Sequence, residues 1–166
     1  MALTKVLTGG IAADAVDNTI LKLDDDFAFT GTVTGSAQPA FHVRLNDSGA
    51  SVQNPHTTNT VYENQGSHWD STNHRFVAPV AGFYFFIVTG YTVYAQGHGY
   101  LAMRKNGAQQ HQLIHWNYAS TGNMHGMGGM TAGLTLAVND YVDVTRPSAG
   151  AASYWNIFNV SGFLIG

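Results

Sequence analysis

The 166-residue chain contains no cysteine, and charged residues make up only 10% of it. Without cysteine, a disulfide framework, a thiol nucleophile and a thiolate metal site are all excluded. Seven lysines and arginines stand against ten acidic residues, which gives a formal net charge of −3. Such a chain has no basic stripe to neutralise phosphates, so we expect no nucleic-acid partner.

The sequence also lacks the long apolar segments that direct a chain to a membrane. The start, MALTKVLTGGIAADAVDN, has no apolar core of signal-peptide length, and no later segment reaches transmembrane length. We therefore expect no membrane insertion. If the protein acts outside a cell, we expect it to leave by a route other than a classical N-terminal signal.

Helical periodicity is missing as well, and β-type runs separated by turns take its place. No window sustains apolar residues at helical spacing, and 19 glycines recur too often for long helices. The runs and turn signals have the spacing of an all-β sandwich or barrel. The chain ends in FNVSGFLIG, and apolar residues so close to a terminus are typical of a buried strand. The predicted strands cover residues 39–45, 74–79, 82–92, 99–106, 109–118, 128–138, 141–146 and 156–165.

Residues 1–36 differ in composition from the rest of the chain. They contain no Trp, Tyr or His, and they hold five of the ten acidic residues. We expect this segment to be an extended β-type arm that acts as an anchor or stalk, and residues 37–166 to form the head domain. The five acidic residues are Asp14, Asp17, Asp24, Asp25 and Asp26.

The run FYFFIV, residues 83–88, is apolar or aromatic at every position. Successive side chains of a strand point to opposite faces of its sheet, and a continuous apolar run predicts that both faces are covered. One face of the predicted strand carries Phe83, Phe85, Ile87 and Tyr91, and the other carries Tyr84, Phe86 and Val88.

The segment VYENQGSHWDSTNHRFVAPVAGFYFF resembles the signature of the globular head of the complement C1q family. Three further pieces follow in the family's order: LAMRKNG (101–107), LTLAVNDYV (134–142) and FNVSGFLI (158–165). His74 and Asn139 stand where the family has glycine, and both residue types are enriched at positive φ. The matching residues of the first segment are Trp69, Asp70, Phe76, Ala78, Pro79, Gly82, Tyr84 and Phe86.

The resemblance covers about residues 39–166 and implies a ten-stranded jelly-roll β-sandwich that assembles as a tight homotrimer, like tumour necrosis factor. In this family the strand that corresponds to residues 83–91 lies in the inner sheet. One of its faces would then fill the core of the sandwich, and the other would meet neighbouring subunits at the three-fold axis. The sequence leaves open which face meets the axis.

A second resemblance concerns the segment DNTILKLDDDFAFTGTVTG, residues 17–35. It resembles the start of bacteriophage tail-fibre and virion-adhesin chains, in which Phe-x-Phe-x-Gly-x-Val-x-Gly repeats form trimeric β-stalks. This implies a virion structural protein, assembled in the host cytoplasm and released by lysis, that is attached to the particle through residues 1–36.

The predicted function is accordingly a trimeric fibre or receptor-binding tip. One alternative is a capsid-decoration or head-fibre protein with a structural role. Another is a secreted ligand of the C1q or tumour necrosis factor type, which the lack of a signal peptide and of a collagen repeat disfavours.

No motif indicates an enzyme, a metal site or a cofactor. HQLIH, His111 to His115, has a zinc-ligand spacing, but Gln112 stands where a zinc protease needs glutamate. On a strand the two histidines are about 13 Å apart, too far to share one ion. DDD (24–26) lacks the spaced ligands of a calcium loop, GMGGM (126–130) lacks the Lys-Ser/Thr of a phosphate loop, and no Gly-x-Ser-x-Gly elbow occurs.

The family jelly roll places both termini at one end, the base, which assigns each connection to an end of the sandwich. Connections near residues 79–82, 106–109 and 138–141 are then at the base. Those near 93–99, 118–127 and 146–156 are at the opposite end, the apex.

The apex segments VYAQGHG, YASTGNMHG and RPSAGAASYWN combine aromatic rings with small polar residues. This mixture is typical of antibody paratopes, and loops on a rigid scaffold commonly carry binding. We predict a distal tip that contacts a host surface glycan or protein; in the alternative, these are solvated turns with Trp155 in the core. The candidate binding residues are Tyr94, His98, Tyr118, Asn123, His125, Tyr154 and Trp155.

Overall fold

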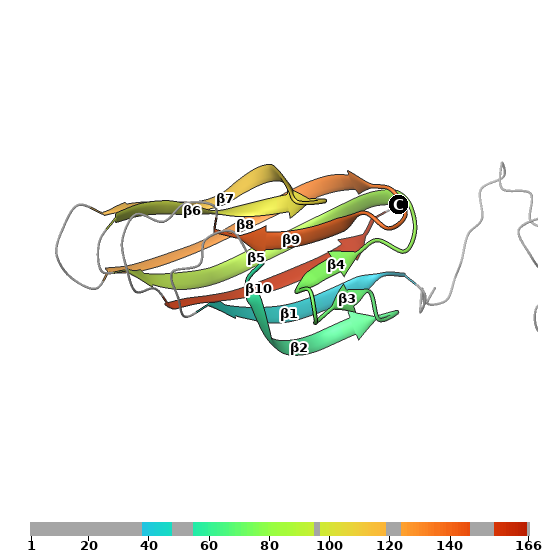
Figure 1. Ribbon diagram of the computed structural model, residues 1–166, viewed down its shortest axis with the longest axis horizontal. Coiled ribbons are helices and arrows are strands. Elements are labelled where there is room, and N and C mark those ends of the chain that lie inside the picture. The colour runs from blue at the N-terminus through green and yellow to red at the C-terminus, as the bar shows by residue number, and fades with distance from the viewer. Residues whose placement is uncertain (1–37, 48–54, 95–96, 119–123, 147–154, 166) are drawn as a thin grey trace, which may run out of the picture. The chain divides into compact units, whose positions relative to one another are not determined.

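A computed structural model describes residues 38–47, 55–94, 97–118, 124–146 and 155–165, and all of these are in strands, turns or short connections (Figure 1). The chain divides into two units, residues 1–34 and 35–166, and every described residue belongs to the second. The predicted arm, residues 1–36, lies outside the described residues.

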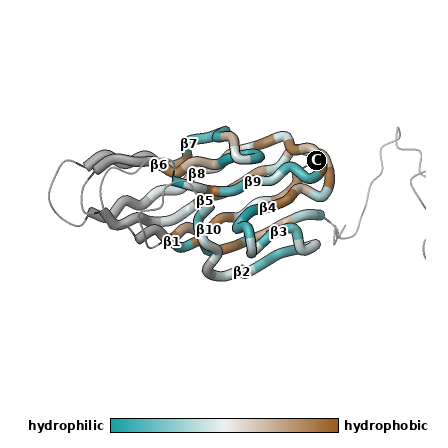
Figure 2. The backbone as a smooth tube through the Cα atoms, viewed as in Figure 1, coloured by the Kyte–Doolittle hydropathy of each residue, from teal (hydrophilic) through white to brown (hydrophobic). Residues whose placement is uncertain are grey.

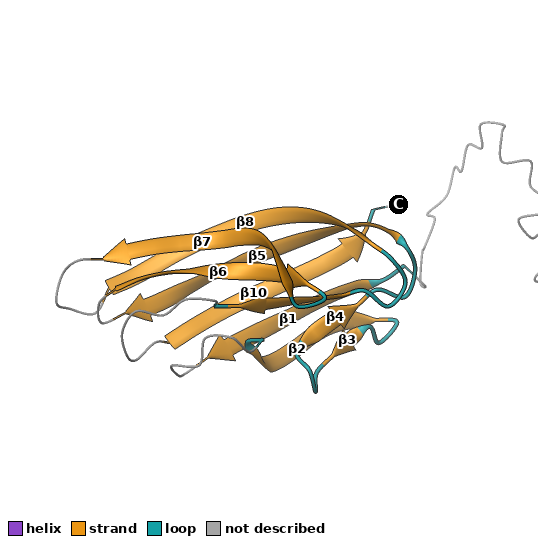
Figure 3. Ribbon diagram, turned by 45° about the horizontal axis from the view of Figure 1, so that its top comes forward, coloured by secondary structure: helices purple, strands orange, loops and turns teal. Residues whose placement is uncertain are grey.

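Within the described ranges, ten strands form two five-stranded antiparallel sheets that face each other (Figure 3). Sheet I has the order β2-β1-β10-β5-β8, and sheet II has the order β3-β4-β9-β6-β7. The bounds in sheet I are β2 Thr57–Gln65, β1 Ala40–Asp47, β10 Trp155–Leu164, β5 Gly82–Tyr94 and β8 Met124–Leu136. Those in sheet II are β3 Trp69–Asp70, β4 Arg75–Val77, β9 Tyr141–Thr145, β6 Gly97–Lys105 and β7 Ala108–Tyr118.

All eight strands predicted from the sequence are present, with small shifts at their ends, and the jelly-roll β-sandwich is confirmed. Two strands were missed, namely β2 and the short β3. β2 is an edge strand rich in Thr, Asn and Gln, and Figure 2 shows how polar it is along its length. Polar residues on an edge prevent pairing with other chains, but they also hide the strand from a search for apolar alternation.

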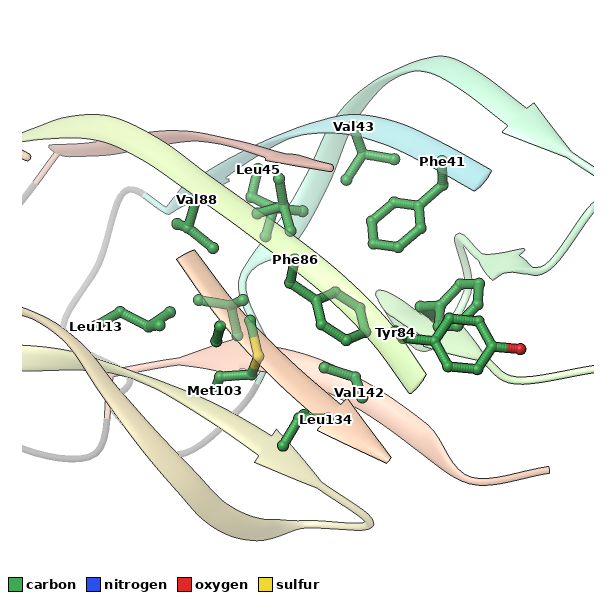
Figure 4. Close-up of a cluster of buried hydrophobic side chains, with 14 of the residues drawn as sticks. Phe41, Val43, Leu45, Tyr84, Phe86, Val88, Met103, Leu113, Leu134 and Val142 are labelled. Atoms are coloured by element: carbon green, nitrogen blue, oxygen red, sulfur yellow. The ribbon is translucent and has the colours of Figure 1, made fainter. Parts of the chain in front are cut away.

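The core lies between the two sheets and follows the alternation of side chains along each strand (Figure 4). β5 contributes Tyr84, Phe86 and Val88, which are fully buried. Because every second residue of a strand points to the same face, the intervening residues of β5 point away from this core. Other buried core residues are Phe41, Val43, Leu45, Phe76, Leu101, Met103, Leu113, Leu134, Leu136, Val142, Val144, Phe158 and Val160.

Several residues of the family signature meet in one aromatic cluster within this core. Trp69 pairs with Phe76 across β3 and β4, and both rings stack on Phe41 with centroids 5.0 Å apart. Phe76 also contacts Tyr84 at 5.4 Å and Phe86 at 6.1 Å. The signature therefore encodes the contact between the two sheets at this end of the sandwich.

The β3–β4, β6–β7 and β8–β9 turns have the backbone conformations that the sequence requires. His74 and Asn139, the residues in place of the family glycines, adopt φ values of 54° and 68°. Asn106 and Gly107 join β6 to β7 with φ values of 51° and 80°, as expected for a type I′ hairpin turn. The tolerance of histidine and asparagine for positive φ thus preserves turns for which glycine is the usual choice.

Candidate functional site

The outer face of sheet I carries a row of apolar side chains that the described residues leave partly exposed. Phe83 and Ile87 of β5 are 43% and 36% exposed, and Phe163 of β10 and Ile165, which directly follows β10, are 39% and 56% exposed. Phe85 is half-buried between them because its ring lies 5.9 Å from that of Phe163. We refer to these five residues as the apolar face.

A glycine on the neighbouring strand supports this arrangement. Phe83 is paired with Thr135 of β8, and the next residue on the same face of β8 is Gly133. A Cβ atom at Gly133 would collide with the ring of Phe83, because the tip of that ring occupies the space over Gly133. The absence of a side chain therefore fixes the position of an exposed aromatic ring.

The opposite face of β5 is the core face, and its polar atom is satisfied. The hydroxyl of Tyr84 donates a hydrogen bond to the carbonyl of Val80 at 2.9 Å. Burial raises the pKa of this hydroxyl above its ordinary value, and the hydrogen bond to Val80 opposes that shift. The structure thus divides the predicted strand 83–91 into a buried face and an exposed one; the side chain of Tyr91 lies outside the described residues.

Sequence reasoning identified the part of the apolar face on β5 but missed the part on β10. The ending FLI was interpreted as a buried strand, and in the single chain Phe163 and Ile165 are instead exposed on either side of half-buried Leu164. The sequence signal for this exposure was the alternation of side chains along the strand, which places Phe163 and Ile165 on the face opposite to that of Leu164. Because β10 is a central strand between β1 and β5, Phe163 lies opposite Phe85.

The predicted apex residues are distributed over the ends of both sheets. In sheet I, the strand register places Trp155 opposite Val93 and Val93 opposite His125, and it places Tyr94 one residue farther along β5. In sheet II, His98 follows directly after Gly97, whose partner is Tyr118. Asn123 and Tyr154 lie outside the described residues.

All five described apex positions thus belong to strand ends at the side of the sandwich opposite the C-terminus (Figure 1). The connections between these strand ends, residues 95–96, 119–123 and 147–154, are outside the described part of the chain. The prediction that Tyr94, His98, Tyr118, His125 and Trp155 form one binding surface stays a prediction about their side chains.

The three base connections are held together by backbone and carboxylate hydrogen bonds. Ala78 donates to the carbonyl of Asp140 at 2.8 Å, and Asn139 donates to the carbonyl of Ala78 at the same distance. The Asp140 carboxylate accepts from Lys105 and Asn106, at 2.8 and 2.6 Å. These bonds, with one from the Ala137 amide, lower the pKa of Asp140 to about 2. The base is therefore a rigid end, as expected from its short turns.

No metal-binding cluster of three or more His, Cys, Asp or Glu residues occurs within the described ranges. His111 and His115 both lie on β7, as the strand interpretation of HQLIH predicted. The part of the chain that the structure covers has no helix long and apolar enough to cross a membrane.

Comparison with known proteins identifies this architecture. The family model of the C1q domain matches residues 40–165. Among solved structures, the chain is similar to the globular domain of the zebrafish complement 1qA protein, with 21% identity and a TM-score of 0.59 over 78% of this chain and 98% of that one. It is also similar to Eiger TNF from S. frugiperda, with 13% identity and a TM-score of 0.56 over 78% and 94% of the two chains.

The fold therefore defines a jelly roll of the C1q and tumour necrosis factor type. Since the family model matches most of the chain, the protein belongs to the C1q domain family. The two solved structures share too little sequence to indicate more than the fold. A comparison with curated proteins finds no match.

Proposed function

We propose that the protein is a non-enzymatic binding head that works as a homotrimer, with the apolar face of sheet I packed between subunits and the apex as its recognition surface. The observation that carries this proposal is the exposed row formed by Phe83, Phe85, Ile87, Phe163 and Ile165. Contiguous exposed apolar surface on a soluble domain marks an interaction site.

The geometry of the apolar face favours a second and third copy of the same chain as its occupant. The face lies on β10 and β5, the middle strand of sheet I and its neighbour, so it is a broad surface rather than an edge available for strand addition. C1q and tumour necrosis factor domains typically form trimers, which agrees with a self-association surface of this kind.

The apex is the proposed ligand-binding end because candidate binding residues of both sheets lie at the strand ends on that side. Trp155, Tyr94 and His125 end three neighbouring strands of sheet I, in the order β10, β5 and β8. Backbone positions held in hydrogen-bonded strands are preorganised, which reduces the ordering cost of binding.

For the biological setting, we propose a virion fibre or receptor-binding tip that recognises a host surface glycan or protein and is attached through residues 1–36. The support for this setting is the resemblance of residues 17–35 to tail-fibre chains. A capsid-decoration protein and a secreted C1q-like ligand use the same head. Gold-labelled antibody would separate them, because label at the distal end of a tail supports the fibre and label on the capsid supports decoration.

The experiment that tests the recognition surface replaces Tyr94, His125 and Tyr154 together by alanine. The intact head and the variant are labelled and applied to a panel of bacterial cells and purified surface polysaccharides. We expect the variant to lose binding while keeping the sedimentation coefficient of the parent protein. Unchanged binding by a correctly assembled variant would place recognition elsewhere on the head.

A further inference from the structure

A polar cavity of about 480 Å³ lies on sheet II, away from both the apex strand ends and the apolar face. Small-molecule sites have volumes of roughly 300–1,000 Å³, so this cavity is large enough for a ligand of sugar size. Its floor is formed by outward-facing side chains of β4, β9 and β6, and its wall by the start of β2 and the turn before β4. The lining residues are Pro55, Thr57, Thr72, Asn73, His74, Arg75, Arg104, Tyr141 and Asp143.

The cavity exists because two segments share one edge of β9 and leave a space between them. β4 pairs with β9 at Tyr141 and Val142, and the segment before β2 meets β9 again where Pro55 forms a bridge with Thr145. Asp143 lies on β9 between these two contacts. Since Val142 and Val144 face the core, Asp143 and Tyr141 face outward into the space.

Two arginines and one carboxylate set the charge of the floor. Arg104 donates to both oxygens of Asp143, from Nε at 2.7 Å and from Nη2 at 2.9 Å, and Asp143 is only 3% exposed. The guanidinium of Arg75 lies over the ring of Tyr141, 4.4 Å from its centroid, and its Nε is 3.4 Å from Asp70, which is not part of the lining. Stacking on an aromatic ring holds a guanidinium in place while leaving its edge free for ligand contacts.

The wall is a turn whose shape is fixed by hydrogen bonds. The carboxylate of Asp70 accepts from the amides of Thr72 and Asn73, each at 3.0 Å, and from the Asn73 side chain at 2.6 Å. His74 adopts positive φ, and its Nδ1 accepts from the amide of Thr58 at 3.0 Å. The imidazole therefore carries its proton on Nε2 when neutral. A fixed wall of hydroxyl, amide and imidazole groups is suited to a ligand with several hydroxyls.

We propose that this cavity is a second binding site, which takes a sugar bearing a carboxylate. The guanidinium of Arg75 would bind the carboxylate, a charge-assisted contact of the kind that arginine favours. The two threonines and Asn73 would bind hydroxyls, while Asp143 holds Arg104 in place. Inorganic sulfate fits less well because it has no hydroxyls for the two threonines and Asn73, and a neutral sugar offers no carboxylate to the guanidinium of Arg75.

This site would stay open in the proposed trimer. The apolar face is on the outside of sheet I, whereas the cavity is on the outside of sheet II, and the core separates the two sheets. The inference therefore does not depend on the proposed function: the cavity would bind its ligand in a monomer as well as in a trimer.

The test uses the full chain and two probes that differ only in the anionic group, sodium glucuronate and glucose. Calorimetric titration is expected to give a dissociation constant on the order of 1 mM for glucuronate and binding at least about tenfold weaker for glucose. A short oligosaccharide that ends in glucuronate shows whether a polymer end is bound as well as the free sugar acid. The amide NMR signals of Thr72, Asn73 and His74 report whether the ligand occupies this cavity.

Arg75→Gln is expected to weaken glucuronate binding about tenfold or more and to leave glucose binding unchanged, with Arg75→Lys in between. Lys5→Gln, which removes one positive charge outside the head domain, is the matched control and should bind like the parent. If Arg75→Gln does not fold, the Arg75→Lys variant and the NMR shifts of the parent protein decide. No binding of glucuronate at about 10 mM, binding unaffected by Arg75→Gln, or equally tight binding of sulfate would overturn the proposal.

Discussion

Replacing Phe83 and Phe163 by serine should dissociate the proposed homotrimer. Phe83 is 43% exposed and Phe163 is 39% exposed in the single chain. A phenylalanine offers about 200 Å² of surface, so each ring leaves roughly 80 Å² that a partner subunit can cover. Three protomers give about 480 Å², which at 25 cal/mol per Å² corresponds to about 12 kcal/mol per trimer if burial is complete.

Even half of this stabilisation has a large effect on assembly. A loss of about 6 kcal/mol changes the equilibrium constant between the trimer and three monomers by about four powers of ten. Because that constant scales with the square of the protein concentration, the concentration at which half of the chains are trimeric rises about 100-fold.

Sedimentation velocity over a dilution series measures this midpoint. Val138→Ser is the matched control, since Val138 is 53% exposed in the base turn between β8 and β9 and is not one of the five residues of the apolar face. The control should assemble like the parent, whereas the double variant should be monomeric at concentrations where the parent is trimeric. A parent protein that sediments as a monomer at micromolar concentration, or a double variant with an unchanged midpoint, would refute the reasoning.

Two further predictions concern stability. Burial, reinforced by the charge of Arg146, lowers the pKa of His56 from 6.5 to about 4. As the pH falls, His56 is therefore protonated in the unfolded chain before it is protonated in the folded chain. The free energy of unfolding should therefore fall by about 2.5 kcal/mol between pH 7.5 and pH 4.5 from this group alone, and urea titrations of His56→Gln should lack that part of the pH dependence. Asn139 has a φ of 68°, so Asn139→Ala should lower the free energy of unfolding by about 1 kcal/mol, whereas Asn139→Gly should stay within about 0.5 kcal/mol of the parent in the same assay. Equal effects of the two substitutions would show that the side chain, not the backbone conformation, matters.

The part of the fold that the sequence predicted was encoded in local chemistry. Strand β5 carries the continuous apolar run of residues 83–88, and the Asn106–Gly107 dipeptide specifies the hairpin between β6 and β7, so both are recognisable without neighbours. The two missed strands, β2 and β3, depend on partners. Among the described strands, β2 is polar and pairs with β1 alone, and β3 has two residues that bring Trp69 against Phe76. Nothing within these short segments indicates such long-range pairing.

Functional surfaces were predicted unevenly for the same reason. The apolar side chains of β5 were visible as a run, but the complete apolar face needs β10, which is adjacent in space and about 70 residues away in sequence. The cavity on sheet II was not predicted at all, because Arg75, Arg104 and Asp143 come from three strands, two of which, β4 and β6, each pair with β9. A set of polar residues dispersed in this way has no motif.

The two outer faces of the sandwich differ in chemistry, and the core explains how they can. In every strand that lines the core, alternate residues face the core, and the residues between them can vary without loss of core packing. On β5 those residues are Phe83, Phe85 and Ile87, whereas on β9 they are Tyr141 and Asp143. An apolar outer face favours contact with other protein subunits, and a charged, hydrogen-bonding one favours polar ligands in water. One jelly roll thereby separates a surface suited to assembly from a surface suited to binding, with the core between them.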